Sequence, residues 1–333
     1  MELLKAHESF SMRLRRNRKS SAIRDLVREN RVSTCDLVVP FFVIEGENRK
    51  QEISSMPGIF RWTSDLLVEH VKQLYKRGIK AIAIFPVIEN EKKNEQGTEA
   101  LNPNGLIPST VSMIKKAMPE ICVICDVALD PYTSHGHDGL VDDNECIVND
   151  PTIRVLGDMS LVLAESGTDI IAPSDMMDGR IVYIRRQLDE EGFQDVSLLS
   201  YAAKYASKLY GPFRDALCSH LQFGDKKTYQ MDPANQKEAL LEAYLDEKEG
   251  ADLLMVKPAT FYLDIIAKIK EQSKRPIAAY HVSGEYAMVM AAHQKGYLDG
   301  PAVLYESLLS IKRAGADVIF TYAVEEIWEF LDQ

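Results

Sequence analysis

The sequence has no long hydrophobic run, few cysteines and no excess of basic residues. The longest early apolar run, Leu37–Ile44, has eight residues including a proline, whereas a membrane-spanning helix needs about 20. That run also starts too late for a secretory signal peptide. The five cysteines form an odd set without framework spacing, so we expect reduced thiols and a cytoplasmic location. The 39 basic and 50 acidic residues give a net charge of −11, which argues against nucleic-acid and membrane partners.

Cys122 and Cys125 form a C-x-x-C pair. A redox pair or half of a zinc site is one interpretation of this spacing. The other is two small apolar residues on a buried strand, where positions i and i+3 face opposite sides. No second C-x-x-C completes a zinc site, so we favour the buried strand.

The basic residues are concentrated at the amino terminus. Residues 1–31 contain nine basic and four acidic side chains, a net charge of +5, which leaves −16 on residues 32–333. The densest cluster is Arg13–Lys19. We predict that residues 1–31 form an arm that docks on an acidic neighbouring subunit and that residues 32–333 form the catalytic domain. A solvated tail and a nucleic-acid-binding arm are the alternatives.

Short runs rich in Val, Ile and Ala alternate with amphipathic stretches along the rest of the chain. Such runs are typical of parallel strands buried on both faces. Eight strands alternating with helices predict a (β/α)8 barrel, also called a TIM barrel. An open doubly wound sheet is the alternative, but no G-x-G-x-x-G motif follows the first run. The eight runs are Val38–Val43, Ala81–Val87, Cys122–Leu129, Ile170–Ala172, Val196–Tyr201, Leu253–Val256, Ile277–Tyr280 and Val318–Tyr322.

Three stretches between these runs have a composition that predicts their structure. Ser64–Arg77 has apolar residues at helical spacing, which predicts an amphipathic helix. Pro131–Asp150 and Gly211–Asn235 are long polar connections. Connections of this length in a compact domain are usually lids or binding loops.

Two lysines lie near the carboxyl ends of consecutive predicted strands, where the active site of such a barrel is found. Lys257 follows an apolar strand and precedes Pro258, so we expect it to be partly buried. Burial and a second nearby ammonium both lower the pKa of a lysine, and a neutral amine can attack a ketone to form a Schiff base. The alternatives are that Lys257 extends into solvent and that Lys204 lies exposed at the start of a helix.

A segment of 14 residues beginning at Asp126 contains five potential ligands or acids. Asp126 and Asp130 share one face of a strand, which would be the barrel interior. Asp130 and Asp138 supply hard oxygen donors, which suit magnesium better than zinc. His135 and His137 either bind a metal or substrate, or belong to a lid that is hydrogen-bonded to itself.

Eight motifs lie in order over almost the whole chain: Arg13–Lys19, Asp126–Gly139, Ala172–Arg180, Ser200–Lys204, Gly211–Ala216, Lys227–Pro233, Met255–Ala259 and Tyr280–Tyr286. In these motifs the sequence resembles the porphobilinogen synthase family, also called the delta-aminolevulinate dehydratases. The resemblance implies a (β/α)8 barrel with an N-terminal arm, assembled as a homo-octamer.

The resemblance also implies a reaction. The family condenses two molecules of 5-aminolevulinate into porphobilinogen with loss of two waters, an early step of tetrapyrrole biosynthesis. It implies a Schiff base on Lys257 for the substrate that gives the propionate half, and one on Lys204 for the acetate half. Two ketones in one pocket explain why two amines are needed. Asp126 is then implied to transfer protons or to position an amine, and Ser174 to make a polar contact.

The two substrate carboxylates need cations or hydrogen-bond donors. The resemblance assigns one carboxylate to Arg214, Lys226 and Gln230, and the other to Ser283 and Tyr322. Many relatives have arginine at the position of Lys226. Lysine keeps the charge but loses the two-pronged geometry of arginine, so we expect a looser contact.

The metal requirement is where this sequence departs from part of the family. Zinc-dependent members have three cysteines at the positions that here hold Ala128, Asp130 and Asp138. Without thiolates we expect no catalytic zinc. The sequence resembles the aspartate-rich, magnesium-responsive branch, which implies an activating Mg²⁺ near a subunit interface, with Glu238 on its water shell. Asp130 and Asp138 are possible further metal ligands.

Two other functions are compatible with parts of this pattern. A class I aldolase shares the barrel and one Schiff-base lysine, but it does not need two strand-end lysines and two anion sites. A non-enzymatic metabolite sensor on a degenerate barrel would be expected to have lost Lys204 or Lys257.

Overall fold

The computed structural model describes residues 12–331. The chain divides into two compact units, Met1–Arg31 and Val32–Gln333. In the described part of the first unit, a 3₁₀ turn, η2 (Leu14–Arg18), precedes a short helix, α1 (Ser21–Leu26). The Ser20 hydroxyl caps α1 by accepting a hydrogen bond from the backbone N–H of Ile23 at 3.3 Å. Docking of this arm on another subunit stays a prediction.

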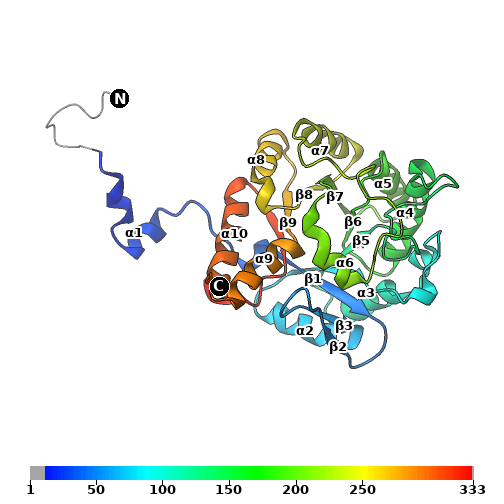
Figure 1. The fold of residues 1–333 in the computed structure, drawn as a ribbon, viewed down its shortest axis with the longest axis horizontal. Coiled ribbons are helices and arrows are strands. Elements are labelled where there is room, and N and C mark those ends of the chain that lie inside the picture. Colours follow the sequence, from blue (N-terminus) through cyan, green and yellow to red (C-terminus); the bar gives the residue numbers. More distant parts are fainter. Residues whose placement is uncertain (1–11, 332–333) are drawn as a thin grey trace. The chain divides into compact units, whose positions relative to one another are not determined.

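Eight parallel strands of the second unit close into a barrel. Their order is β1–β4–β5–β6–β7–β8–β9–β10, and β10 pairs with β1 to complete the ring. Figure 1 shows these strands at the centre, with helices around them. The predicted (β/α)8 barrel is therefore confirmed, and the alternative of an open doubly wound sheet is wrong. The strands are β1 (Leu37–Ile44), β4 (Ala81–Pro86), β5 (Cys122–Val127), β6 (Ile170–Pro173), β7 (Ser197–Lys204), β8 (Leu253–Lys257), β9 (Ile277–His281) and β10 (Val318–Thr321).

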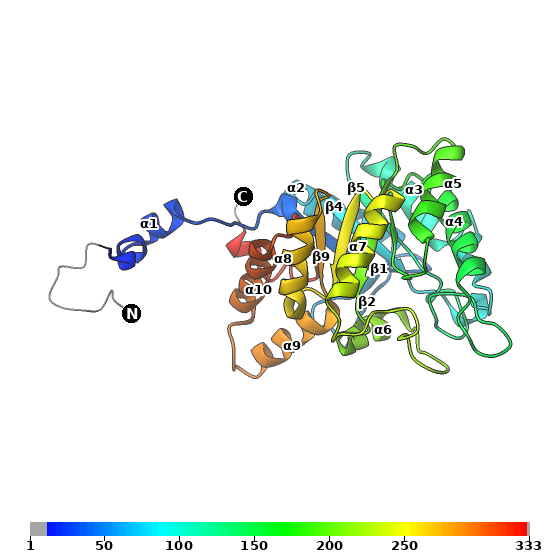
Figure 2. The ribbon, with the colours of Figure 1, turned by 90° about the horizontal axis from the view of Figure 1, so that it is seen from above.

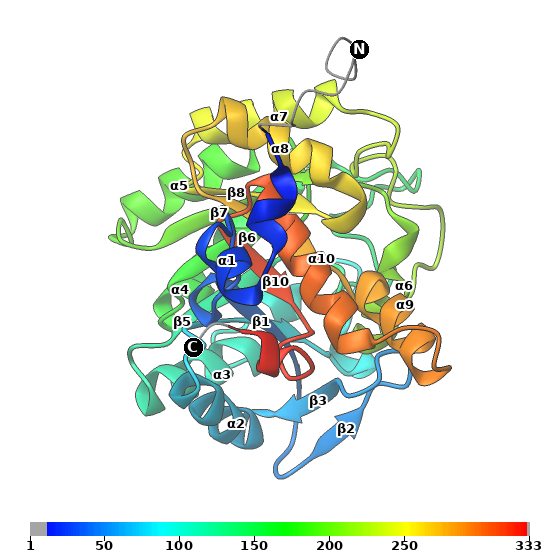
Figure 3. The same cartoon turned by 90° about the vertical axis from the view of Figure 1, so that its left-hand side faces the viewer.

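Two further strands, β2 (Lys50–Glu52) and β3 (Phe60–Thr63), were not predicted from the sequence. β3 pairs in parallel with the end of β1, and β2 pairs antiparallel with β3. Figure 3 shows this ribbon next to α2 (Ser64–Lys76). All three residues of β2 are exposed, so no apolar pattern in the sequence marks it as a strand.

The helices pack around the barrel through their apolar faces. α2 begins at Ser64 as predicted, and it buries Leu67, Val68, Val71 and Leu74. This spacing of three and four residues is the stripe that an amphipathic helix turns toward a core. The other helices are α3 (Leu106–Ala117), α4 (Asn149–Glu165), α5 (Arg180–Glu190), α6 (Gly211–Leu217), α7 (Lys237–Glu249), α8 (Leu263–Gln272), α9 (Ser283–Gln294) and α10 (Gly300–Ala314). None of the helices in residues 12–331 is long and apolar enough to span a membrane.

The two long polar connections meet at the carboxyl end of the strands. One follows β5 and the other follows β7, and Figure 2 shows α6 and the loop after it at one end of the barrel. The backbone N–H of Gln222 donates to the carbonyl of His135 at 3.1 Å. Gly136 has a φ of +77°, and a Cβ added there would lie 2.6 Å from the carbonyl oxygen of His220. Glycine is therefore required where the two loops touch.

Candidate active site

Lys204 and Lys257 end two neighbouring strands and lie directly opposite each other in the register of β7 and β8. Lys204 is 6% exposed and Lys257 is 5% exposed. The structure therefore rejects both an exposed Lys204 at the start of a helix and a solvent-facing Lys257. β7 continues three residues beyond the predicted end of its apolar run, as far as Lys204 itself.

An irregularity in β7 explains how Lys204 reaches the barrel interior. Ser200 pairs with Leu254, and Ala203 pairs with Val256, so β7 has one more residue than β8 over this stretch. An extra residue of this kind reverses the alternation of side chains. Tyr201 and Lys204 can then face the same side, although they are three residues apart. The ring centroid of Tyr201 lies 6.0 Å from Lys204 Nζ and 5.1 Å from Lys257 Nζ.

Aromatic rings surround the amine of Lys257. Its Nζ lies 4.4 Å from the ring centroid of Tyr280, 4.9 Å from that of Phe213 and 5.4 Å from that of Tyr210. Burial and the charge of Lys204 together lower the pKa of Lys257 to about 7, although Asp126 opposes this shift. Near neutral pH a large fraction of Lys257 is therefore the neutral amine that nucleophilic attack requires.

Lys204 belongs to a buried network of charges with Asp138, Lys226 and Asp130. Its Nζ donates to the carbonyl oxygen of Ser174 and lies 3.4 Å from Asp138 Oδ2. Lys226 Nζ donates to Asp138 Oδ1 and, at 3.1 Å, to Asp130 Oδ2. Burial alone would raise the pKa of Asp138, but Lys204 and Lys226 hold it at about 2. Burial lowers the pKa of Lys226 less than Asp130 and Asp138 raise it, so that its pKa lies above the ordinary value.

Asp126 occupies the end of β5 and has an unused acceptor. Its buried Oδ1 has no hydrogen-bond partner within residues 12–331. Burial raises the pKa of Asp126 to about 6, against the effect of Lys257, Lys204 and the Ser174 hydroxyl. A carboxyl group with this pKa can exchange a proton close to neutral pH, as a general acid or base must.

The residues expected to bind the first carboxylate lie in the connection after β7. Arg214 is on α6, and its guanidinium makes no hydrogen bond or ion pair to any described residue. Gln230 is buried, and its backbone N–H donates to the carbonyl of Lys226 at 2.8 Å. Arg214 therefore has free donors, whereas Lys226 is already engaged by two aspartates. The looser contact expected of Lys226 stays a prediction.

The residues expected to bind the second carboxylate are both buried. Ser283 begins α9, and its Oγ accepts a hydrogen bond from the backbone N–H of Phe213 at 3.0 Å. The hydroxyls of Tyr322 and Tyr280 are 3.0 Å apart. This pair connects Tyr322 to a ring that also contacts Lys257.

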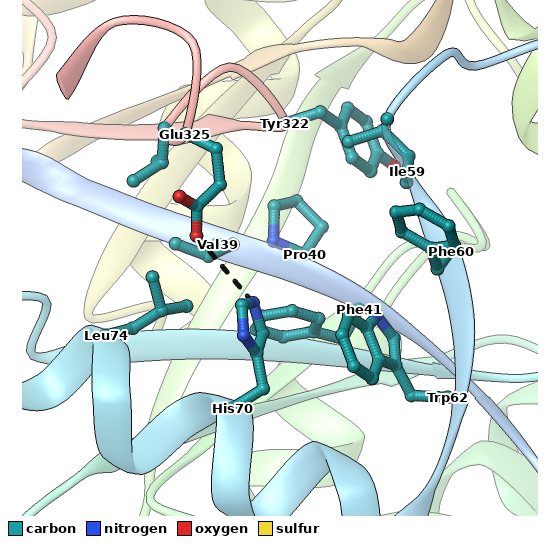
Figure 4. Close-up of a pocket in the computed structure, with 12 residues that line it drawn as sticks. Val39, Pro40, Phe41, Ile59, Phe60, Trp62, His70, Leu74, Tyr322 and Glu325 are labelled. Carbon is teal, nitrogen blue, oxygen red and sulfur yellow. Dashed lines mark ion pairs between the residues drawn. The ribbon is translucent and has the colours of Figure 1, made fainter. Parts of the chain in front are cut away.

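The ring of Tyr322 also borders a separate cavity (Figure 4). Trp62 and His70 stack in its wall with ring centroids 4.7 Å apart, and His70 Nε2 lies 3.9 Å from Glu325 Oε1. Neither lysine lines this cavity. It is therefore distinct from the site built on Lys204 and Lys257.

His135 and His137 are hydrogen-bonded within the lid. His135 Nε2 lies 3.2 Å from the carbonyl of Glu95, and His135 Nδ1 accepts from the backbone N–H of His137 at 3.1 Å. The two ring nitrogens of His137 lie 3.2 Å from the Tyr229 hydroxyl and 3.1 Å from the carbonyl of Phe223. Of the two interpretations, the structure favours the lid that is bonded to itself.

Cys122 and Cys125 lie on β5 as expected of structural residues. Burial raises the pKa of Cys122 to about 11 and that of Cys125 to about 12. Thiols with these pKa values are poor nucleophiles and poor metal ligands at neutral pH.

Glu238 lies at the start of α7 and lines an open hollow of about 770 Å³. Asp178 and Glu242 line the same hollow. Burial and the neighbouring Asp246 together raise the pKa of Glu242 to about 7. Sequence reasoning missed Glu242, although its position one helical turn after Glu238 could have indicated a shared face. Within residues 12–331, no three His, Cys, Asp or Glu side chains are grouped closely enough to bind a metal directly.

Comparisons with known proteins agree with this geometry. The family model described as delta-aminolevulinic acid dehydratase matches residues 11–330. This chain belongs to the delta-aminolevulinic acid dehydratase family. A family member from Chlamydia pneumoniae is 52% identical over 325 residues, covering 98% of each chain. One from Bradyrhizobium diazoefficiens is 53% identical over 314 residues, covering 94% of this chain and 89% of its own.

A solved structure extends the family match to three dimensions. Delta-aminolevulinic acid dehydratase (porphobilinogen synthase) from Toxoplasma gondii, in complex with the reaction product porphobilinogen, superposes with a TM-score of 0.93. It is 50% identical, and the match covers 96% of this chain and 91% of the Toxoplasma chain. Family membership therefore rests on the sequence and on the fold.

Proposed function

We propose that this chain is a porphobilinogen synthase that joins two molecules of 5-aminolevulinate and releases two waters. The observation that carries the proposal is the pair of buried lysines opposite each other on β7 and β8. The names of the relatives support the same reaction. A class I aldolase needs one Schiff-base lysine, so it leaves the second one without a purpose.

The lysines are suited to act in sequence. The neutral amine of Lys257 attacks the ketone of the first substrate, and loss of one water gives a Schiff base. Lys204, whose Nζ donates to Ser174 and faces Asp138, would react with the second ketone and release the second water. Formation of the carbon–carbon and carbon–nitrogen bonds then displaces both lysines. The rings of Tyr280, Phe213 and Tyr210 support this assignment, because aromatic faces stabilise the cationic Schiff base on Lys257.

The remaining residues would move protons and bind the carboxylates. Asp126, with a pKa of about 6 and an unpartnered oxygen, would accept or deliver protons near both Schiff bases. Arg214 and Gln230, with Lys226, would bind one carboxylate. Ser283 and Tyr322 would bind the other, and Ser174 would make a polar contact.

We also propose that Mg²⁺ activates the enzyme from the hollow lined by Glu238. Magnesium prefers carboxylate oxygens and retains several waters. A wide hollow with Asp178, Glu238 and Glu242 in its wall, but without a compact group of three ligands, suits a hydrated ion. Such an ion would supply positive charge there and favour the assembly that binds it best. Ala128, Asp130 and Asp138 provide no thiolate for zinc.

The assembly is proposed to be a homo-octamer in which the basic arm docks on a neighbouring subunit. Within residues 12–31, the side chains of Met12, Leu14, Leu26 and Val27 are exposed. Exposed apolar side chains beside clustered arginines support a docking surface for an acidic partner.

A colorimetric assay tests the reaction. Purified protein with 5-aminolevulinate as the sole substrate should produce a pyrrole at a rate proportional to enzyme concentration. Cleavage or addition of aldol substrates without pyrrole formation would instead identify an aldolase.

A further inference from the structure

Glu285 is a buried carboxylate that connects the two ends of one substrate site. It is 3% exposed and lies in the first turn of α9. Its Oε2 accepts a hydrogen bond from the backbone N–H of Val282 at 2.5 Å. Its Oε1 accepts one from the backbone N–H of Thr260, also at 2.5 Å. One carboxylate therefore connects the loop after β8 with the loop after β9.

Each loop adjoins a residue of the proposed first substrate site. Thr260 comes three residues after Lys257, whose own carbonyl accepts from the backbone N–H of Tyr205 at 3.0 Å. Val282 immediately precedes Ser283. Lys257 would bond the ketone carbon of the substrate, and Ser283 would bind its carboxylate.

Capping of α9 explains only half of this arrangement. A glutamate in the first turn commonly accepts from the N–H just before its own helix, and the bond from Val282 is of that kind. The bond from Thr260 satisfies no part of α9, because it holds the first N–H of the 3₁₀ turn Thr260–Tyr262, which follows β8. Burial raises the pKa of Glu285 to about 7, although both backbone bonds favour the ionised form. A cap at the protein surface would avoid the cost of burying a carboxylate.

The end of α9 is also packed too closely to shift easily. A Cβ added to Gly284 would lie 2.4 Å from the carbonyl oxygen of Leu209. Ser283 Oγ accepts from the backbone N–H of Phe213 on α6 and lies 3.5 Å from the same carbonyl oxygen of Leu209. The loop bearing Ser283 is therefore fixed against α6, and Glu285 fixes the Lys257 loop to it.

We propose that Glu285 is a positioning residue that sets the separation between Lys257 and Ser283, and so matches the site to a keto acid of one length. The proposal rests on the function proposed above, because it assumes that one substrate contacts both residues.

The test compares two ketones that differ only in the carboxylate. Levulinate is the substrate without its amino group, and pentan-2-one has the same carbon chain with a methyl in place of the carboxylate. Borohydride reduces either Schiff base on Lys257 to a stable adduct that mass spectrometry quantifies. In Glu285→Gln, the backbone N–H of either Thr260 or Val282 faces the amide NH₂ group and loses its acceptor. We therefore expect the trapping efficiency of levulinate, divided by that of pentan-2-one, to fall about tenfold. Trapping of pentan-2-one should stay within about twofold of the unaltered chain, because this ketone has no carboxylate for Ser283 to bind. A purely structural loss would instead reduce the trapping of both ketones alike.

Two further variants make the outcome decisive. Glu285→Asp keeps the charge but is one methylene shorter, and the ratio should fall in the same direction. Asp317→Asn is the matched control, since Asp317 accepts from the backbone N–H of Ile277 at 2.8 Å at the opposite end of β9. Its ratio should equal that of the unaltered chain. An unchanged ratio in either folded Glu285 variant, or an equal loss with both ketones, overturns the positioning role. Failure of the unaltered chain to form any Lys257 adduct would instead refute the proposed function.

Discussion

Lys204 and Lys257 are register partners across β7 and β8, and the ring of Tyr201 lies within 6.0 Å of both amines. Two like charges placed so close disfavour each other, so one amine tends to be neutral. Burial and the charge of Lys204 lower the pKa of Lys257 to about 7. Asp138 and the Ser174 carbonyl face Lys204, whereas aromatic rings face Lys257. Lys257 is therefore expected to form the first Schiff base.

Lys204→Met should separate the two covalent steps. The variant should still form the borohydride-trapped adduct on Lys257 but make almost no porphobilinogen. Because the charge of Lys204 lowers the pKa of Lys257, its removal should raise the pKa of adduct formation above about 7. Trapping rates between pH 6 and 10 measure this shift. Near-normal product formation by the variant would contradict the two-Schiff-base assignment.

Asp126→Asn should have the opposite effect and lower the pKa of Lys257. The carboxylate of Asp126 raises the pKa of Lys257, so its loss should shift adduct formation to lower pH. Turnover should fall by about 10²–10⁴, the usual contribution of a general acid or base. Steady-state rates and trapping profiles give both quantities. A variant that keeps its turnover would remove Asp126 from the mechanism.

The barrel and the lysine at the end of β8 were predictable because both follow from apolar patterning. Lys257 directly follows a continuous apolar run, so its burial could be read from the sequence. Lys204 could not be placed in this way, because the extra residue between Ser200 and Ala203 reverses the side-chain alternation. The irregularity has no signature in the order of apolar and polar residues.

Contacts between distant segments could not be predicted from the sequence either. Glu242 resembles any polar residue of an exposed helix until Asp246 and the surrounding hollow are placed beside it. The self-bonded lid of His135 and His137 depends on Phe223 and Tyr229, which lie in the other long connection. Such contacts form only when the barrel closes and brings these segments together.

Arg180→Met should destabilise the fold strongly. Arg180 Nη2 lies 3.1 Å from Asp246 Oδ2, and both side chains are almost completely buried. Removing the arginine leaves a buried carboxylate without its partner, which costs about 3–5 kcal/mol. Urea unfolding of the variant and the unaltered chain gives the difference in unfolding free energy. A loss below about 1 kcal/mol, the range of a surface pair, would contradict the burial of this ion pair.

Magnesium should stimulate the enzyme through the hollow on α7. After chelation, added Mg²⁺ should raise the initial rate, and added Zn²⁺ should not replace it. Glu238→Ala and Glu242→Gln should each weaken the response by about tenfold in half-saturating Mg²⁺, because a hydrated ion loses a carboxylate contact. Basal turnover and the Lys257 adduct should remain. Tightly bound stoichiometric zinc whose removal abolishes activity would refute the zinc-independent assignment, and an unchanged Mg²⁺ response would exclude the hollow.

The proposed reaction depends most on Lys257, as a nucleophilic amine whose pKa is near neutrality. The most direct test is borohydride trapping with 5-aminolevulinate across a pH series, followed by peptide mapping of the adduct. We expect the adduct to map to Lys257 and its rate of formation to rise through about pH 7 and then level, because the protonated ammonium cannot attack. A rate that still rises toward 10.5, the value of an ordinary lysine, or an adduct on another residue with Lys257 unmodified, would contradict this expectation.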